Sequence, residues 1–224
     1  MTPFPDTWLI VPLYNEATVI GGVIREAIQT FPHVICVDDG SHDNSARLAH
    51  EAGAVVISHP INLGQGAALQ TGFDYFLRST DGRYLITFDA DGQHQISDAV
   101  RMREVAQNEG LAVVLGSRFL GGPSPVGWLK KLVLKTAATV TRVQTGMKLS
   151  DAHNGLRLLR RDAVEAVHLD QNRMAHATQI IEQLARSGLP WREIPVHIRY
   201  TDYSRSKGQS LWNSVNILVE LIMR

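Results

Sequence analysis

Two carboxylates separated by one residue follow a predicted strand, and they are the strongest chemical signal in the sequence. The run Asp89-Ala90-Asp91-Gly92-Gln93-His94 comes directly after an apolar stretch at residues 84–88. Carboxylates this close repel each other, a cost that is sensible where a divalent cation takes oxygens from both. Mg²⁺ held this way usually keeps waters and is shared with substrate phosphates. An EF-hand is excluded because its further ligands and closing Glu are absent, whereas a solvated acidic turn remains the alternative.

Polar residues also follow the first two predicted strands. These strands lead into Pro12-Leu13-Tyr14-Asn15-Glu16 and Asp38-Asp39-Gly40-Ser41, respectively. Carboxylates at such strand ends can accept hydrogen bonds from a ribose or a base edge, and Gly40 permits the turn that aims them. Capping of the next helix by Ser41 and Asp43 is the alternative interpretation.

A glycine-spaced helix entrance follows the third predicted strand. It reads Asn62-Leu63-Gly64-Gln65-Gly66-Ala67-Ala68, and its free backbone N–H groups could face an anion. The pattern lacks the Lys of a P-loop and the spacing of a dinucleotide fingerprint. A tight helix start without a ligand is equally compatible with it.

Three later segments each carry cations suited to phosphate oxygens. They are Gly116-Ser117-Arg118, the run from Asp151 to Arg157, and the polar loop that contains Arg205 and Lys207. Arg157 could instead pair with Asp151, and Arg205 with Lys207 could merely decorate a surface loop. Three such segments together with a metal site favour phosphate binding.

The elements that position these residues alternate between short β-branched runs and longer helical patterns, which is typical of βα units feeding a parallel sheet. Strands are predicted at residues 8–11, 33–37, 54–58, 84–88 and 111–115, and helices at residues 17–29, 44–51, 65–77 and 97–107, the last capped by Ser97. Open sheets of this kind bind ligands at the C-terminal ends of their strands. The residues just after each strand therefore matter most.

The pattern becomes more helical after Arg118, beyond a breaker cluster at residues 121–125 that is typical of a flexible loop. Helices are predicted at residues 128–144, 162–167, 175–186 and 211–223, and a strand at residues 193–200. We expect one α/β domain over residues 1–224, with a nucleotide-binding half at 1–91 and an acceptor-binding half at 92–224 that ends in the C-terminal helix.

Composition limits the class of protein further. The chain has 224 residues, 22 basic and 22 acidic side chains and 44% hydrophobic residues, which excludes disorder, collagen and a disulfide scaffold. The single cysteine, Cys36, lies in an apolar run and is predicted to be buried in a reducing compartment. Zero net charge gives no general attraction to nucleic acid, so no nucleic-acid partner is expected. Without a signal peptide or a run of about 20 apolar residues, we expect a cytoplasmic protein, either soluble or peripheral at the inner face of the membrane.

Five motifs in this order resemble family 2 glycosyltransferases of the GT-A fold, a Rossmann-like α/β fold. They are residues 12–16, 37–41, 62–68, 89–93 and 116–118. Within that family the chain is similar to dolichyl-phosphate-mannose synthases and other polyprenyl-phosphate glycosyltransferases. The resemblance covers almost the entire chain.

The resemblance implies a role for each motif. Pro12, Tyr14, Glu16, Asp38 and Asp39, together with Gly66, Asp89 and Ala90, would hold the donor nucleotide. Asp89, Asp91 and Gln93 would gather around Mg²⁺ or Mn²⁺ on the donor diphosphate. Arg118, Arg205 and Lys207 would bind phosphate, and the implied catalytic residues are Asp91, Arg118, Asp151 and Arg157. The implied reaction is an inverting transfer from a nucleotide sugar of the GDP-mannose or UDP-glucose type.

The acceptor is suggested by a departure from the family pattern. A hydroxyl nucleophile usually needs a general base, whereas a lipid phosphate is already ionised near neutral pH. Members with hydroxyl acceptors place a carboxylate early in the helix at residues 175–186, where this sequence has His176 or Gln179. This favours polyprenyl phosphate as acceptor. Extension of a cell-surface polysaccharide or lipid-linked oligosaccharide at a sugar hydroxyl remains the alternative, with Glu182 or Asp151 as base.

The last predicted helix, at residues 211–223, has a broad apolar face. That face suits packing on its own domain, on a membrane surface or on a partner, and a small membrane-protein partner subunit is one expectation. Of other classes, a nucleotidyltransferase is disfavoured because its early Gly-rich basic loop is missing. A noncatalytic nucleotide-sugar-binding subunit stays open.

Overall fold

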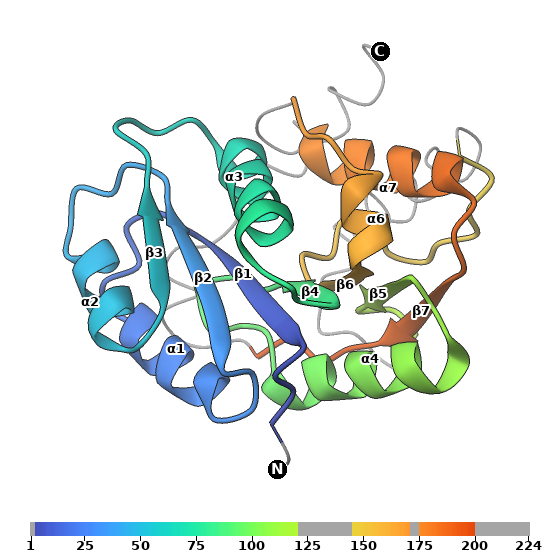
Figure 1. Ribbon diagram of the computed structural model, residues 1–224, viewed down its shortest axis with the longest axis horizontal. Helices are drawn as coiled ribbons and strands as arrows, with labels where there is room; N and C mark the ends of the chain where they lie inside the picture. Colours follow the sequence, from blue (N-terminus) through green and yellow to red (C-terminus); the bar gives the residue numbers. More distant parts are fainter. Residues whose placement is uncertain (1–2, 121–144, 171–174, 200–224) are drawn as a thin grey trace.

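A central seven-stranded sheet organises the computed structural model, which describes residues 3–120, 145–170 and 175–199. The strands lie in the order β3-β2-β1-β4-β6-β5-β7 (Figure 1). They are β1 (Thr7–Leu13), β2 (His33–Asp38), β3 (Val55–Ser58), β4 (Tyr84–Thr87), β5 (Val113–Ser117), β6 (Arg157–Arg160) and β7 (Trp191–Pro195). Neighbouring strands are parallel except at β6, which runs antiparallel to both β4 and β5. The fold is therefore α/β with a mostly parallel sheet, as predicted.

Helices cover both faces of this sheet (Figure 1). One face carries α1 (Ile20–Ile28), α2 (Ser45–Glu51) and α4 (Ile96–Glu109), and the other carries α3 (Gln65–Ser79), α6 (Arg161–Glu165) and α7 (Ala175–Ser187). Alternate residues of β1 supply the two cores, since Leu9 packs in one apolar cluster and Ile10 in the other. Cys36 is fully buried in the first cluster, as predicted, and burial raises the pKa of its thiol.

Most predicted elements are present, but three predictions of local structure are wrong. No strand was predicted at β6, because a four-residue Arg-Leu-Leu-Arg segment has no strand signal of its own. The strand predicted at 193–200 lies instead at Trp191–Pro195, where it pairs with β5. The predicted Ser97 cap is not formed, since Gln95 is the N-cap residue of α4 and makes no side-chain capping bond. The helices predicted at 128–144 and 211–223, and the loop at 121–125, lie outside the described residues.

Strand register brings three chain exits to one edge of the sheet. Leu13 at the end of β1 pairs with Asp38 at the end of β2, and Ile10 pairs with Thr87 at the end of β4. Because these strands are parallel, the loops that follow them lie side by side at the carboxyl edge. The motifs at 12–16, 38–41 and 89–94 are thereby placed together.

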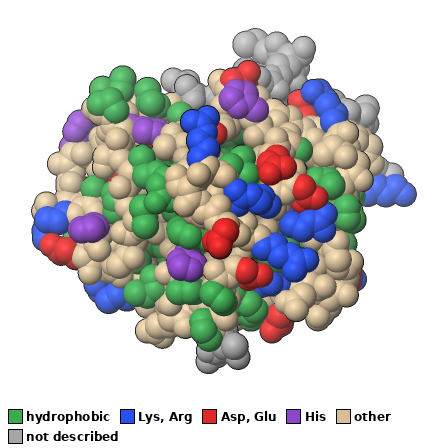
Figure 2. Space-filling model, in the orientation of Figure 1, with side chains coloured by type: hydrophobic (Ala, Val, Ile, Leu, Met, Phe, Trp, Pro, Cys, Tyr) green, Lys and Arg blue, Asp and Glu red, His purple; other side chains and the backbone are tan. Residues whose placement is uncertain are grey.

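The surface is mixed in charge. Acidic and basic side chains lie intermingled on the face shown in Figure 2, in agreement with 22 residues of each sign. Within the described part of the chain, no helix is long and apolar enough to cross a membrane.

Candidate active site

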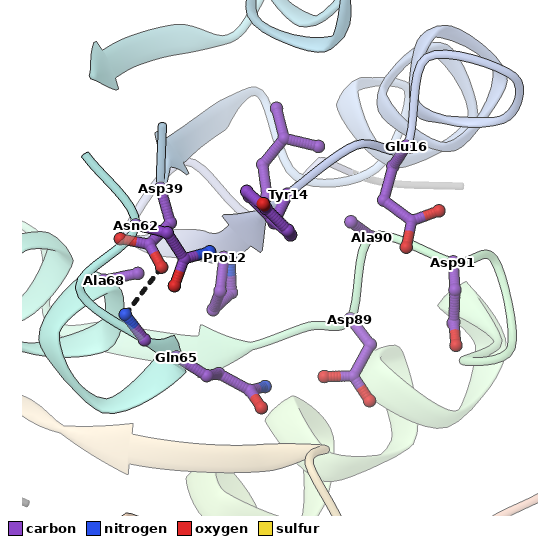
Figure 3. Close-up of a pocket in the computed structure, with 12 residues that line it drawn as sticks. Pro12, Tyr14, Glu16, Asp39, Asn62, Gln65, Ala68, Asp89, Ala90 and Asp91 are labelled. Carbon is purple, nitrogen blue, oxygen red and sulfur yellow. Dashed lines mark hydrogen bonds between the residues drawn. The ribbon is translucent and has the colours of Figure 1, made fainter. Parts of the chain in front are cut away.

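A pocket of about 430 Å³ opens at the carboxyl edge of the sheet (Figure 3). Its walls come from the exits of β1, β2 and β4 and from the start of α3. The lining residues are Pro12, Leu13, Tyr14, Glu16, Asp39, Asn62, Gly64, Gln65, Ala68, Asp89, Ala90 and Asp91. Most residues predicted to hold the donor nucleotide therefore meet in one pocket. Asp38 and Gly66 are buried beside it and are not among its lining residues.

Asp39 fastens the loop that forms one wall of the pocket. Its carboxylate accepts hydrogen bonds from the backbone N–H groups of Leu63, at 2.9 Å, and Gly64, at 2.7 Å. The ring of His59 lies 2.8 Å from the same carboxylate. Gly40 lets the backbone after β2 approach the backbone of Ile61 closely, because a Cβ at Gly40 would lie 2.7 Å from the carbonyl carbon of Ile61. Asp39, which follows β2, thus holds the loop that leads into α3.

The loop after β1 is held by the loop after β2. Ser41 Oγ accepts a hydrogen bond from the Asn15 N–H at 2.9 Å, and Asn15 Oδ1 accepts one from the His42 N–H at 2.9 Å. Asp43 accepts hydrogen bonds from the Ala17 N–H at 3.2 Å and from the Ser45 N–H at 2.9 Å, although the N-cap residue of α2 is Asn44, so neither Ser41 nor Asp43 caps this helix as the alternative predicted. These contacts fix the backbone that carries Tyr14 and Glu16 into the pocket.

Three carboxylates border the same side of the pocket, those of Glu16, Asp89 and Asp91 (Figure 3). Asp91 accepts hydrogen bonds from the Gln93 backbone N–H at 3.0 Å and from the Gln93 side-chain amide at 2.8 Å. Burial, and then repulsion from Asp89, raise the pKa of Asp91, and Glu16 acts in the same direction. The site therefore concentrates negative charge that a cation would neutralise.

The donor set suits a hard divalent cation that keeps other oxygen ligands. Asp89 and Asp91 supply carboxylate oxygens, whereas the amide of Gln93, predicted to be a third ligand, lies against Asp91 and outside the pocket lining. Among the described residues there is no group of three His, Cys, Asp or Glu side chains arranged to hold a metal. A Mg²⁺ or Mn²⁺ ion here would need further oxygens from substrate or water, as is usual for Mg²⁺ shared with phosphates.

Two residues with no role predicted from the sequence lie against the Asp89 carboxylate. His94 is buried, and its Nε2 atom lies 3.3 Å from Asp89 Oδ2. Gly155 also adjoins this carboxylate, because a Cβ at Gly155 would lie 2.7 Å from the same oxygen. The carbonyl of Gly155 accepts a hydrogen bond from Thr87 Oγ1 at 2.5 Å, which ties this loop to the end of β4. The position of His94 in the acidic motif was a signal for it, whereas nothing in the sequence placed Gly155 beside Asp89.

Arg118, which is partly buried, forms an ion pair with the buried Asp151. The Nε and Nη2 atoms of Arg118 lie 2.7 and 2.8 Å from the two carboxylate oxygens of Asp151, and its backbone N–H donates at 3.0 Å. Although burial acts to raise the pKa of Asp151, this pairing holds it below the usual value. The sequence-based alternative in which Asp151 pairs with Arg157 is therefore wrong. Neither Arg118 nor Asp151 lines the pocket described above.

The start of α7 brings a histidine, and no carboxylate, towards Asp89. His176 and Arg157 line a smaller cavity of about 90 Å³ next to Asp89. Gln179 donates a hydrogen bond to Asp170 at 2.5 Å. Glu182, one candidate base, lines a separate cavity that shares no lining residue with the large pocket. Arg205 and Lys207 lie outside the described residues.

Comparisons with known proteins identify relatives of this chain. The family model described as Glycosyl transferase family 2 matches residues 8–167. The chain is 30% identical, over 96% of its length and 84% of the relative's, to polyprenol monophosphomannose synthase of Mycolicibacterium smegmatis. It is 27% identical, over 96% and 94% of the two lengths, to UDP-N-acetylglucosamine–dolichyl-phosphate N-acetylglucosaminyltransferase of Methanococcus voltae.

Solved structures show the same fold. Glucosyl-3-phosphoglycerate synthase from Mycobacterium tuberculosis, crystallised with Mn²⁺, UDP and glucosyl-3-phosphoglycerate, superimposes with a TM-score of 0.67 at 16% identity. The match covers 96% of this chain and 79% of that one. The same synthase has also been crystallised with Mg²⁺ and UDP.

Proposed function

Because the chain belongs to glycosyl transferase family 2 and is a glycosyltransferase, we propose that it moves a sugar from a nucleotide sugar to polyprenyl phosphate, with inversion at the anomeric carbon. The observation that carries this proposal is the arrangement around Asp89. Carboxylates suited to a metal diphosphate border the large pocket, whereas the start of α7 faces the adjoining cavity with His176. Two relatives support the same acceptor class, since the name of one specifies polyprenol monophosphomannose as its product and the name of the other specifies dolichyl phosphate as its acceptor.

In this proposal the nucleoside occupies the pocket between the exits of β1 and β2. Pro12, Tyr14 and Glu16 would line it on one side, and Asp39 would shape the opposite wall through its bonds to Leu63 and Gly64. Asp38 and Gly66, which are both buried, would support these walls. All the lining residues fall within 1–91, in agreement with the proposed nucleotide-binding half.

Asp89 and Asp91 would hold Mg²⁺ or Mn²⁺, which neutralises charge on the departing nucleoside diphosphate when bound. Neighbouring residues of the chain already position these two carboxylates when no metal is bound. His94 contacts the Asp89 carboxylate, the missing side chain of Gly155 leaves room for it, and Gln93 donates a hydrogen bond to Asp91. Preorganised charge of this kind requires little rearrangement during the reaction.

A phosphate acceptor needs no general base, and the site agrees with that requirement. Asp151 is committed to Arg118, which keeps it ionised and hydrogen-bonded on both oxygens. Glu182 lines a different cavity with Arg186. An ionised lipid phosphate would attack the anomeric carbon directly, in line with the departing diphosphate. Because such an acceptor resides in a bilayer, we propose that the reaction takes place at the membrane surface, on its cytoplasmic side.

The test is a transfer assay with a panel of nucleotide sugars, each with and without polyprenyl phosphate and with Mn²⁺, Mg²⁺ or EDTA. We expect a lipid-extractable sugar product that requires both the metal and the lipid phosphate. Asp91→Asn should lower the rate by roughly 100-fold or more. The matched control is Asp81→Asn at an exposed position, which should keep full activity. Equal rates for the two variants would contradict the assignment of the site.

A further inference from the structure

The small cavity beside Asp89 is a second compartment of the site. Its volume is about 90 Å³, and it shares Pro12, Gln65 and Asp89 with the larger pocket. This volume exceeds the roughly 10–15 Å³ that one water molecule requires, so a group of several atoms fits. Its remaining polar walls include Arg157, His153 and His176.

Arg157 is a buried charge that no contact neutralises within the part of the chain that the structure describes. It lies in β6 between β4 and β5, and only 3% of the residue is exposed. Burial lowers the pKa of Arg157 to about 10, so the guanidinium is still charged at neutral pH. Within residues 3–120, 145–170 and 175–199, its side chain forms no hydrogen bond and no ion pair. Buried charges are normally paired, and a charge left without a partner indicates a missing anion.

The nearby carboxylates do not supply that partner. Asp89 and Asp151 lie close enough to attract Arg157 electrostatically. Asp89, however, contacts His94, and Asp151 binds Arg118 through both of its oxygens. The N–H groups of the Arg157 guanidinium are therefore available to a ligand in the cavity.

A second unpaired group lines the same cavity. The Nδ1 atom of His153 is buried and has no hydrogen-bond partner among the described residues. Burial, and then the charge of Arg157, lower the pKa of His153 to about 4, so the ring is neutral at physiological pH. A neutral imidazole can offer one N–H group to a ligand oxygen.

We propose that this cavity binds one phosphoryl group of a substrate, with Arg157 donating to its oxygens and His153 adding a further hydrogen bond. The planar fork of a guanidinium matches phosphate oxygens, and the charge compensates that of the ligand. A sugar hydroxyl in the same place would leave Arg157 uncompensated. The inference rests on the proposed function, under which two phosphoryl sources meet at Asp89: the acceptor phosphate and the donor diphosphate.

Equilibrium binding separates the two sources. Calorimetric titrations of the full chain would use farnesyl phosphate as the acceptor probe, and GDP and UDP with Mn²⁺ as donor probes. The variant is Arg157→Met, and the control is Arg160→Gln in the same strand, where the partly exposed Arg160 pairs with Asp162. We expect Arg157→Met to weaken one class of probe by about 10-fold or more, the usual value of a charged hydrogen bond. The class of probe that loses affinity shows whether the cavity binds the acceptor phosphate or the donor diphosphate.

Stability distinguishes binding from a structural role. Removing a buried charge that lacks a partner should leave the thermal midpoint unchanged or raise it, whereas removing one side of a structural ion pair should lower it. The proposal is overturned if Arg157→Met binds every probe like the wild type, or if Arg160→Gln loses as much affinity. If Arg157→Met does not fold, Arg157→Lys and His153→Phe replace it, and unchanged affinity in both overturns the proposal.

The proposed function and the proposed phosphoryl-binding cavity can be contradicted independently of each other. A wild-type chain that forms no product with polyprenyl phosphate contradicts the acceptor, yet the nucleotide titrations still test the cavity. Conversely, normal lipid product together with unaltered binding by Arg157→Met contradicts the cavity alone.

Discussion

The Nε2 atom of His94 lies 3.3 Å from Oδ2 of Asp89, and Nδ1 of the same ring lies 3.2 Å from the Asp89 backbone nitrogen. The Asp89 backbone N–H donates a hydrogen bond to Nδ1, and Nε2 lies beside the carboxylate, so both ring nitrogens of His94 contact Asp89. The ring also meets Phe88 edge to face, with 5.4 Å between centroids. His94 thus orients the carboxylate that borders both compartments of the site.

Replacing His94 with Phe should weaken metal binding without removing the ring packing. Supporting residues behind a metal ligand typically contribute about 10- to 100-fold in metal affinity or activity. Mn²⁺ titration followed by electron paramagnetic resonance measures the affinity directly, apart from turnover. His50→Phe, at an exposed position in α2, is the control. Wild-type Mn²⁺ affinity in His94→Phe would show that His94 has no positioning role.

Gly155→Ala should displace the Asp89 carboxylate. The added Cβ would lie 2.7 and 2.8 Å from its two oxygens, closer than real Cβ contacts allow. We expect transfer activity to fall by about 10-fold or more, because misplacement of a reacting group by 1 Å can cost about 100-fold. Gly22→Ala is the matched control, since a Cβ there meets nothing within 4 Å in α1. Equal activity of the two variants in the transfer assay would refute the steric argument.

Asp39→Asn should impair donor binding more than turnover. The variant replaces one acceptor oxygen with an NH₂ group, although both oxygens receive backbone N–H groups, from Leu63 and Gly64. A buried donor left unsatisfied costs about 1–3 kcal/mol, so the wall formed by this loop should shift. We expect KM for the nucleotide sugar to rise several-fold with a smaller change in kcat. A fall in kcat at constant KM would place Asp39 in the chemical step instead.

The Arg118–Asp151 pair should stabilise the fold at neutral pH and lose that effect in acid. Because the pKa of Asp151 is lowered in the folded protein, its ionised form contributes stability above the unfolded value of about 3.9. This contribution decreases as the pH falls through the folded pKa. Asp151→Asn should lower the free energy of unfolding by about 1–3 kcal/mol at pH 7, the usual cost of removing a charged hydrogen-bond partner.

Urea denaturation of wild type and Asp151→Asn between pH 7 and pH 3 tests this prediction. The gap between the two free energies should narrow towards the acid end. Asp162→Asn serves as control, because its pair with Arg160 is partly exposed and should contribute less than about 1 kcal/mol. A gap that stays constant with pH would mean that the charge of Asp151 is not what stabilises the fold.

The nucleotide half of the site could be predicted because its residues are local to strand ends. Each strand that carries Pro12, Asp39 or Asp89 has a clear apolar run, and parallel pairing brings the exits of all three to one edge. The hydrophobic periodicity of the sequence therefore predicts the strands, and parallel pairing then predicts where the residues after each strand lie.

The second compartment could not be predicted in this way, because it depends on contacts far apart in the sequence. β6 is a four-residue strand between arginines, with no apolar alternation to reveal it. Only its antiparallel pairing with β4 and β5 buries Arg157 and brings Gly155 against Asp89. The choice of Arg118 over Arg157 as the partner of Asp151 is likewise a matter of tertiary geometry.

The most direct test of the proposed acceptor compares polyprenyl phosphate with the matching polyprenol, using one active nucleotide sugar and Mn²⁺. The two lipids differ only in the phosphate, which is the group that makes a general base unnecessary. We expect sugar transfer to polyprenyl phosphate at a rate that Glu182→Ala leaves unchanged, and no transfer to the alcohol. Transfer to the alcohol or to a lipid-linked sugar, abolished by Glu182→Ala, would contradict it.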